Sequence, residues 1–282
     1  MFRALEEIIK GVPSADGDGV KLTRFIGTAD LDVLDPLLLL DWFENDKSDG
    51  GGAGFPPHPH RGFETVTYML EGKMYHKDNK GNEGTIHPGE VQWMRAASGI
   101  IHSEMPLPVD GKFKGFQLWL NLPALNKSDP SSYQQFQGED IPVEKTETGI
   151  EIRVIAGTTE SGLEGALKND LTEPLFLDIT MTKGKSFEQS IPDSHTAIIM
   201  MINGQAEISG SKIGKDELGV LGAGAKVSII SENNSRFLLI AGKRLNEPII
   251  RGGPFVMNTK EEIQQAFSDY KSGKFKKFKL IK

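Results

Sequence analysis

The chain is divided into short segments by 32 glycines and 15 prolines, and this punctuation constrains the fold more than any other feature. Between these residues lie runs that alternate in polarity or are rich in β-branched residues, such as "ETVTYML", "IEIRVIAG", "HTAIIMMI" and "RFLLIAG". Short runs of this kind, bounded by glycine turns, are typical of all-β sandwiches and barrels. The sequence therefore predicts an all-β protein.

One helix is predicted, close to the end, in "NTKEEIQQAFSDYKSG". Thr259 and Glu262 have the spacing of a capping box, and Gly273 follows the last apolar position. The apolar side of this helix is expected to pack on the body of the protein. The lysines of the final "KSGKFKKFKLIK" alternate with apolar residues, which favours an edge strand with a solvated lysine face over a nucleic-acid patch.

An internal repeat indicates two copies of one β-unit. "TYMLEGKMYH" followed by "HPGEVQWM" recurs as "IMMINGQAEI" followed by "KDELGVLGAG". A polar linker, "NKSDPSSYQQFQGEDIP", lies between the copies, near the midpoint. We therefore expect two similar β-domains, residues 1–135 and residues 136–282.

Two pairs of side chains have the spacing of metal ligands. In an extended segment, residues two apart point to the same side, so His58 and His60 can aim both rings at one point. "GIIHSEMP" supplies His102 and Glu104 with the same spacing. If the two strands are neighbours, three imidazoles and a carboxylate form a site that suits a first-row transition metal. The alternative is that the histidines are incidental polar residues, and the presence of two pairs favours the metal.

The second copy of the repeat lacks this pattern. Aligning Gly72 with Gly204 places Ser190 and Pro192 at the positions of His58 and His60. The nearby histidine at position 195 stands alone, which is typical of a surface or hydrogen-bonded polar residue. Any chemistry is therefore expected in the first half of the chain.

Two further histidines lie close to turns. His76 follows the turn at Gly72, and His87 precedes the Pro88–Gly89 turn. Both are predicted to be loop or rim residues rather than ligands.

The composition excludes several kinds of site. The chain has no cysteine, which removes disulfides, zinc–thiolate sites, iron–sulfur clusters and thiol nucleophiles. The formal net charge of −7 argues against direct binding of nucleic acid. "MFRALEEIIKGVPS" lacks the apolar run of a signal peptide, and "LDPLLLLDWF" is too short to span a bilayer. We expect a soluble cytoplasmic protein, or a nuclear one if the source is eukaryotic, with no membrane partner.

The motifs resemble a known family. The pattern from Gly52 to Glu64 (glycine, five residues, H-x-H, three residues, glutamate) resembles the first motif of the cupin superfamily, and "HPGE" with "GIIH" resembles the second. More narrowly, "FPPHPHRGFETVTYMLEG", "GEVQWMRAASGIIHSEMP", "FQLWLNLP" and "RGGPFVMNTKEEIQQAFSDY" resemble the pirin family over nearly the whole chain. This resemblance implies two cupin (double-stranded β-helix, or jelly-roll) barrels in tandem with a short C-terminal helix. It also implies that the N-terminal barrel binds a metal and that the C-terminal barrel lacks metal ligands.

The resemblance also implies a ligand set. The family's metal ligands fall on His58, His60, His102 and Glu104. Glu64 matches the glutamate of the general cupin motif and is expected behind the ligands or as a reserve ligand, since counting in twos from His60 turns it inward. The implied cofactor is one divalent transition metal, Fe(II) first, with Mn, Ni, Co, Cu or Zn also compatible.

Pirins are similar to quercetin 2,3-dioxygenases, which open the heterocyclic ring of a flavonol and release carbon monoxide. The resemblance thus implies an oxidoreductase that acts on a flavonol and dioxygen, with Glu104 as the catalytic base. Expected pocket walls are Phe55, Met74, Trp93 and Met105. The alternative is a non-catalytic iron-binding regulator that acts through a protein partner, such as a transcription factor or a metabolic enzyme.

Overall fold

The computed structural model describes residues 1–45 and 54–275. These residues form strands β1 to β24 and one α-helix, α1 (Lys260–Lys271), with a short 3-10 turn at Ala124–Asn126. The chain divides into two compact units of interleaved segments. One, called here the histidine unit, comprises residues 13–24, residues 38–138 and the segment that begins at Leu245. The other, called the aliphatic unit, comprises residues 1–12, 25–37 and 139–244.

The histidine unit is built on a seven-stranded and a four-stranded antiparallel sheet. The seven-stranded sheet has the order β12 (Ser132–Phe136), β9 (Val91–Arg95), β6 (Phe63–Glu71), β11 (Phe113–Asn121), β4 (Leu37–Asn45), β3 (Val20–Ile26) and β2 (Val12–Asp16). The four-stranded sheet has the order β5 (Phe55–His60), β10 (Ile100–Leu107), β7 (Lys73–Asp78) and β8 (Glu83–Ile86). A buried apolar cluster joins the two sheets, with Phe55 and Met74 from the smaller sheet packed with Phe43 and Phe113 from the larger one.

The aliphatic unit repeats this architecture. Its seven-stranded sheet has the order β1 (Leu5–Lys10), β20 (Glu217–Leu221), β17 (His195–Asn203), β22 (Ser235–Lys243), β15 (Leu175–Met181), β14 (Ile150–Ala156) and β13 (Val143–Lys145). Its four-stranded sheet has the order β16 (Ser186–Ser190), β21 (Lys226–Ser231), β18 (Gln205–Ile208) and β19 (Ser211–Gly214). The predicted all-β repeat of two barrels is therefore confirmed.

In both units, the turn of the repeated hairpin is formed by a glycine. Gly72 joins β6 to β7 and Gly204 joins β17 to β18, with φ angles of 71° and 76°. A Cβ atom at either position would lie within 2.6 Å of a backbone carbonyl oxygen, so the tight turn requires glycine. These two glycines fix the correspondence between the two sets of strands.

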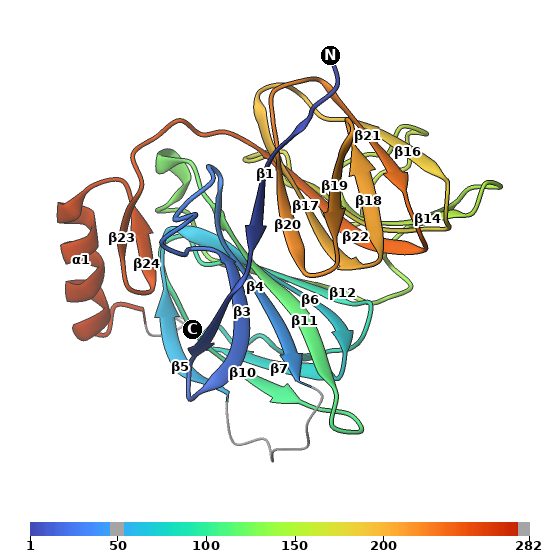
Figure 1. Cartoon of the computed structure of the whole chain (residues 1–282). Helices are drawn as coiled ribbons and strands as arrows, with labels where there is room; N and C mark the ends of the chain where they lie inside the picture. The colour runs from blue at the N-terminus through green and yellow to red at the C-terminus, as the bar shows by residue number, and fades with distance from the viewer. Residues whose placement is uncertain (46–53, 276–282) are drawn as a thin grey trace. The chain divides into compact units, whose positions relative to one another are not determined.

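The first strand of the chain belongs to the aliphatic unit. β1 pairs antiparallel with β20, from Leu5 opposite Leu221 to Lys10 opposite Glu217, and Figure 1 shows dark blue β1 beside orange β20. It occupies the edge position that β12 holds beside β9 in the histidine unit. The units are thus interleaved, whereas the sequence predicted two contiguous halves, 1–135 and 136–282, because strand pairing over such a separation leaves no local signal.

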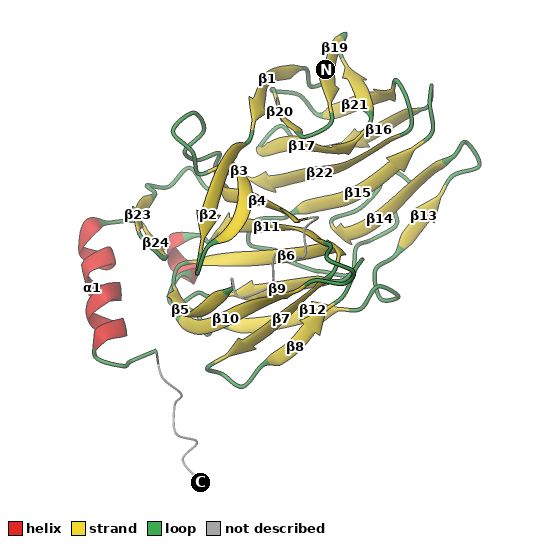
Figure 2. Ribbon diagram, turned by 60° about the horizontal axis from the view of Figure 1, so that its bottom comes forward, coloured by secondary structure: helices red, strands yellow, loops and turns green. Residues whose placement is uncertain are grey.

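The predicted C-terminal helix is present and belongs to the histidine unit (Figure 2). Thr259 accepts from the backbone N–H of Glu262, and the Glu262 carboxylate accepts from that of Thr259, which completes the capping box. Ile263 and Ala266 are buried in an apolar cluster with the strand β24 (Phe255–Met257), which pairs with β23 (Ile250–Gly252). The edge strand predicted for the terminal lysines falls largely on residues 276–282, outside the described residues. No helix of the described chain is long and apolar enough to cross a membrane.

Candidate metal centre

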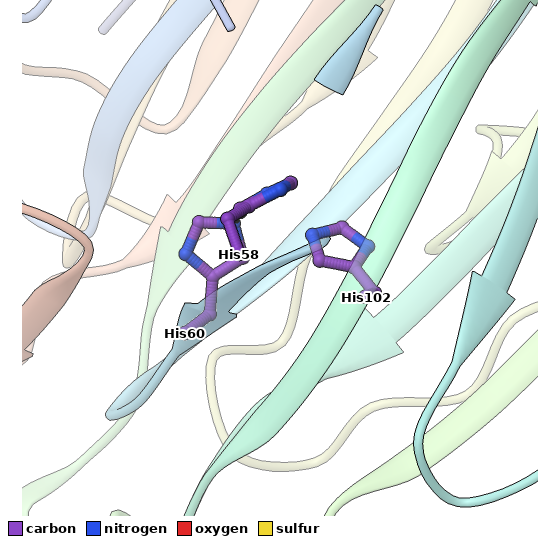
Figure 3. Close-up of side chains that lie close together, drawn as sticks. All are labelled: His58, His60 and His102. Atoms are coloured by element: carbon purple, nitrogen blue, oxygen red, sulfur yellow. Dashed lines mark hydrogen bonds between the residues drawn. The ribbon is translucent and has the colours of Figure 1, made fainter. Parts of the chain in front are cut away.

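Two neighbouring strands bring three histidines together. β5 and β10 pair antiparallel, with His58 opposite His102 and His60 opposite Ile100. One ring nitrogen from each of the three histidines lies within 4.8 Å of the other two. Figure 3 shows the three rings gathered at this point. The strand that carries the H-x-H pair and the strand that carries the H-x-E pair are thus neighbours, as the sequence predicted.

Backbone carbonyl groups orient two of the rings. Nδ1 of His58 lies 2.8 Å from the carbonyl oxygen of Pro56, and Nδ1 of His60 lies 3.3 Å from that of Pro254. An N–H at each Nδ1 donates to its carbonyl oxygen, which leaves each Nε2 with a lone pair. These two Nε2 atoms are 3.0 Å apart, and two lone pairs so close require a shared cation or proton between them.

Burial favours the neutral form of two of these histidines. Burial, reinforced by neighbouring His58, lowers the pKa of His60 to about 3. Burial also holds the pKa of His102 well below its usual range, and the neighbouring histidines act in the same direction. Neutral imidazole is the form that binds metals. Nε2 of His102 is buried and has no hydrogen-bond partner among the described residues. These donors therefore fit a transition-metal ion.

Glu104 is buried next to this cluster and held by hydrogen bonds. Gln117 Nε2 donates to both carboxylate oxygens, at 3.1 and 2.9 Å, and Thr67 donates to Oε1 at 3.2 Å. The Glu104 carboxylate forms a second group with His76 and His102, again within 4.8 Å. The two groups share His102. Among the described residues, the four predicted ligands do not all lie within 4.8 Å of one another.

His76 is a member of the site that the sequence analysis placed wrongly. It was predicted at a loop or rim, but it is fully buried on β7, opposite Glu104 in the ladder with β10. Asp78 lies opposite His102 on the same strand. The sequence feature that could have revealed this is the alternation along β7, in which Met74, His76 and Asp78 point inward and their neighbours point outward. His87, by contrast, is exposed in a loop, as predicted.

Glu64 points away from the histidine cluster. Its carboxylate accepts from Arg95 Nε at 2.7 Å and is buried. Thr67, three residues along β6, faces the cluster, so Glu64 lies on the opposite face of the strand. Counting in twos from His60 failed because Gly62, with a φ of 90°, interrupts the extended backbone between β5 and β6. The geometry gives no support to Glu64 as a reserve ligand.

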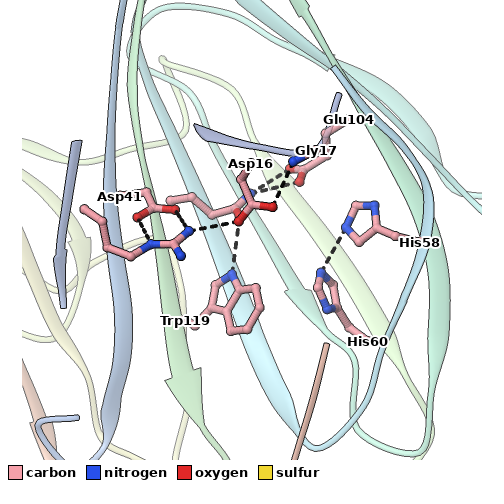
Figure 4. Close-up of polar contacts among 9 residues, drawn as sticks. Asp16, Gly17, Asp41, His58, His60, Glu104 and Trp119 are labelled. Atoms are coloured by element: carbon pink, nitrogen blue, oxygen red, sulfur yellow. Dashed lines mark hydrogen bonds and ion pairs between the residues drawn. The ribbon is translucent and has the colours of Figure 1, made fainter. Parts of the chain in front are cut away.

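Aromatic rings form one wall of the site. The Trp119 ring stacks on Phe63 with centroids 4.3 Å apart and meets His60 edge-on at 5.0 Å. Figure 4 shows Trp119 with the contact between His58 and His60. Trp119 is partly exposed. Sequence reasoning did not identify Trp119.

The predicted wall residues divide into two groups. The Phe55 ring lies 6.4 Å from the His58 ring, and Met74 packs with Phe55 in the apolar cluster of the same unit. Met105 is 38% exposed, on the outer face of β10, because the adjacent residue of the strand points inward. Trp93 lies on the face of β9 that is turned away from the cluster. Of the four predicted wall residues, only Phe55 and Met74 lie on the side of the histidine cluster.

Two barrels of one strand order, with histidines gathered inside one of them, define a two-domain cupin. The Pirin family model matches residues 19–120, and the model of the Pirin C-terminal cupin domain matches residues 176–276. The chain belongs to the pirin family.

Relatives match along almost the whole chain. It is 44% identical to a Pirin-like protein of Caulobacter vibrioides over 273 residues, which cover 97% of this chain and 99% of that protein. It is 40% identical to Pirin of Mus musculus over 267 residues, 92% of this chain and 89% of that protein. A crystal structure of a quercetin 2,3-dioxygenase from Acinetobacter baumannii superposes with a TM-score of 0.88 at 33% identity, covering 98% of this chain and 99% of that one.

Proposed function

We propose that the protein is a metal-dependent dioxygenase that opens the heterocyclic ring of quercetin-type flavonols. The observation that carries this proposal is the convergence of three histidines, two of them buried and one half-buried, beside Glu104 and the partly exposed Trp119. The similarity to a solved protein named as a quercetin 2,3-dioxygenase supports the substrate class. The site thus has metal donors, a carboxylate and an aromatic face.

The proposed ligands are His58, His60 and His102, with Glu104 as the fourth. Imidazole and carboxylate donors suit one divalent transition ion, for which Fe(II) is the first candidate and Mn, Ni, Co, Cu and Zn are also compatible. When bound, such an ion would supply Lewis acidity to the substrate oxygen, and the redox-active ions of this set, unlike Zn, would also supply redox chemistry for dioxygen.

The chain's own residues would position and deprotonate the substrate. The Glu104 carboxylate is proposed to accept the proton of the flavonol 3-hydroxyl, since it lies buried beside the histidine cluster. Gln117 and Thr67 hold this carboxylate in one orientation by donating to its oxygens. The Trp119 ring offers a face for the flat flavonol. Both atoms of dioxygen enter the product as one ring carbon leaves as carbon monoxide.

The test is a quercetin assay on full-length protein of measured metal content. We expect the metal-loaded protein to consume quercetin in air, and neither the metal-free protein in air nor the loaded protein without oxygen to do so. Metal-loaded protein that consumes no quercetin or related flavonol in air would contradict the proposal. That outcome would favour the non-catalytic regulator, for which a protein partner would then be sought.

A further inference from the structure

The third histidine of the cluster differs from the other two in how its second nitrogen is held. His58 and His60 direct Nδ1 to backbone carbonyl oxygens. Nδ1 of His102 instead lies 3.4 Å from Nδ1 of His76, in a fully buried contact. The support of His102 is therefore a side chain, which a substitution can remove without altering the backbone.

His76 is itself fixed on its other sides. Its ring stacks on Tyr133 with centroids 4.9 Å apart and planes inclined by 30°. Its Nε2 lies 3.6 Å from Oδ2 of Asp78, and neither side chain is exposed. Asp78 is anchored in turn, because its oxygens accept from the backbone N–H groups of Lys80 and Asn82 and from the Asn82 amide. The row from Asp78 to His102 thus starts at a carboxylate that the following turn holds in place.

One placement of hydrogens suits every contact along this row, in which the 3.6 Å approach of His76 to Asp78 is an electrostatic contact rather than a hydrogen bond. Only one of the two facing Nδ1 atoms can carry a hydrogen. If neutral His76 carries its hydrogen on Nε2, towards the Asp78 carboxylate, its Nδ1 accepts from the Nδ1–H of His102. Nε2 of His102 then has a free lone pair, and this buried atom has no hydrogen-bond partner among the described residues. The row therefore presents to the cluster the nitrogen that a metal would take.

We propose that His76 is a positioning residue that fixes the ring orientation and tautomer of His102, and that Asp78 holds His76 in the accepting form. The inference rests on the metal site of the proposed function and is independent of its substrate. Partners of this kind, behind metal-bound histidines, typically change metal affinity about 10- to 100-fold when they are removed.

The experiment compares two substitutions of His76 in the full chain. His76→Leu removes the acceptor, whereas His76→Asn places an amide oxygen near the former Nδ1 and can still accept. Affinity for Ni²⁺ is measured by competition with a chelator, and the visible spectrum of the Co²⁺ form reports the ligand geometry. We expect the leucine variant to bind Ni²⁺ about 10- to 100-fold more weakly with an altered Co²⁺ spectrum, and the asparagine variant to recover most of the affinity.

The matched control is His87→Leu, which removes an exposed histidine outside the cluster and should keep wild-type affinity. Thermal unfolding of the metal-free variants reports whether each is folded. If His76→Leu does not fold, Asp78→Asn provides the second test, with a smaller loss of affinity expected because the amide still contacts the following turn.

Three results would overturn the inference. One is wild-type affinity and an unchanged Co²⁺ spectrum in His76→Leu; the second is wild-type affinity in Asp78→Asn. The third is two metal ions per wild-type chain, of which His76→Leu loses one, because His76 would then be a direct ligand. The readouts are separate from turnover: a wild-type protein that binds Ni²⁺ but never consumes quercetin in air with any of the candidate metals contradicts the proposed dioxygenase and leaves this inference standing.

Discussion

The two units have one strand order and opposite interiors. Matched through the hairpin glycines Gly72 and Gly204 and through the strand ladders, five polar positions of the site have fully buried aliphatic counterparts in the aliphatic unit. The matched pairs are His76 and Ile208, His102 and Val227, Glu104 and Ile229, Thr67 and Ile199, and Gln117 and Leu239. The same ladders place Gln189 and Ile191, rather than the predicted Ser190 and Pro192, at the positions of His58 and His60.

This difference shows that the barrel does not need its polar interior in order to fold. In the aliphatic unit, sheets of the same strand order close around branched aliphatic side chains. Burying these side chains stabilises the fold without removing water from polar groups. Buried polar groups are costly unless they are paired. The histidine unit pairs Glu104 through Gln117 and Thr67, yet among the described residues it leaves Nε2 of His102 unpartnered. This cost supports the proposal that the interior serves binding.

The largest expected effect is loss of the metal on removing a proposed ligand. Wild-type protein is expected to hold one ion per chain, and His60→Ala or His102→Ala to hold almost none, because among the described residues such donors gather only in this barrel. Both variants should stay folded, since the same barrel folds without these groups in the aliphatic unit. Elemental analysis and thermal unfolding would measure this.

Val227→Ala, at the position matched to His102, is the control and should retain the ion. Two ions in the wild type would contradict the proposal that one unit alone binds metal. Wholesale unfolding of either histidine variant would contradict the conclusion that the barrel folds without these groups.

The next effect concerns turnover. Glu104→Gln keeps the shape and an oxygen donor but cannot take a proton, so we expect kcat for quercetin to fall about 10²- to 10⁴-fold. Metal content, measured on the same samples, should remain largely intact, because the three histidines are unchanged. Full activity in this variant would leave the dioxygenase in place but remove Glu104 as its base.

A smaller effect is expected in the acid sensitivity of the metal-free protein. Burial holds the pKa of His102 well below 6.5, whereas the unfolded chain takes up this proton near pH 6.5. Below that pH the unfolded state binds more protons, so the free energy of unfolding falls as the pH falls. For one such histidine the loss between pH 6.5 and about pH 5 is about 1.5 kcal/mol.

His102→Val installs the residue of the aliphatic unit and should abolish this contribution. Urea unfolding of both metal-free proteins at the two pH values would measure the difference, in which titrating groups far from His102 cancel. Equal pH dependence in the two proteins would show that His102 is not buried in its neutral form.

The smallest expected effect is at Glu64. Because its side chain pairs with Arg95 on the face turned away from the cluster, Glu64→Gln should leave Ni²⁺ affinity unchanged. Chelator competition measures this, with His60→Ala as the positive control. A marked loss of affinity at unchanged stability would return Glu64 to the list of ligands.

The all-β repeat, the capped helix and the two-residue spacing of the ligand candidates could all be predicted, because each depends on residues close in sequence. Positions that depend on register could not. Counting from the hairpin glycine selected Ser190 and Pro192, one residue out of step with the ladder, and a slip of one residue turns a side chain to the other face. Both are exposed.

His76 and Gln117 join the site only because β7 and β11 are placed beside Glu104 by strands distant in the chain. A run such as "KMYHKD" shows that alternate residues point one way, but not which way is inward. The pairing of β1 with β20 is hidden for the same reason, since more than half of the chain separates the two strands.

The interleaving of the units has a consequence for the nascent chain on the ribosome. When His102 leaves the exit tunnel every proposed ligand has been made, but the carbonyl of Pro254 that orients His60 has not. The same late segment supplies the Val256 carbonyl that accepts from the buried Lys127 ammonium, which also binds the carbonyl of Gly62, just after β5. A ribosome-bound intermediate therefore carries every proposed ligand before the group that orients His60 exists, and the proposed site is completed only when synthesis is nearly finished.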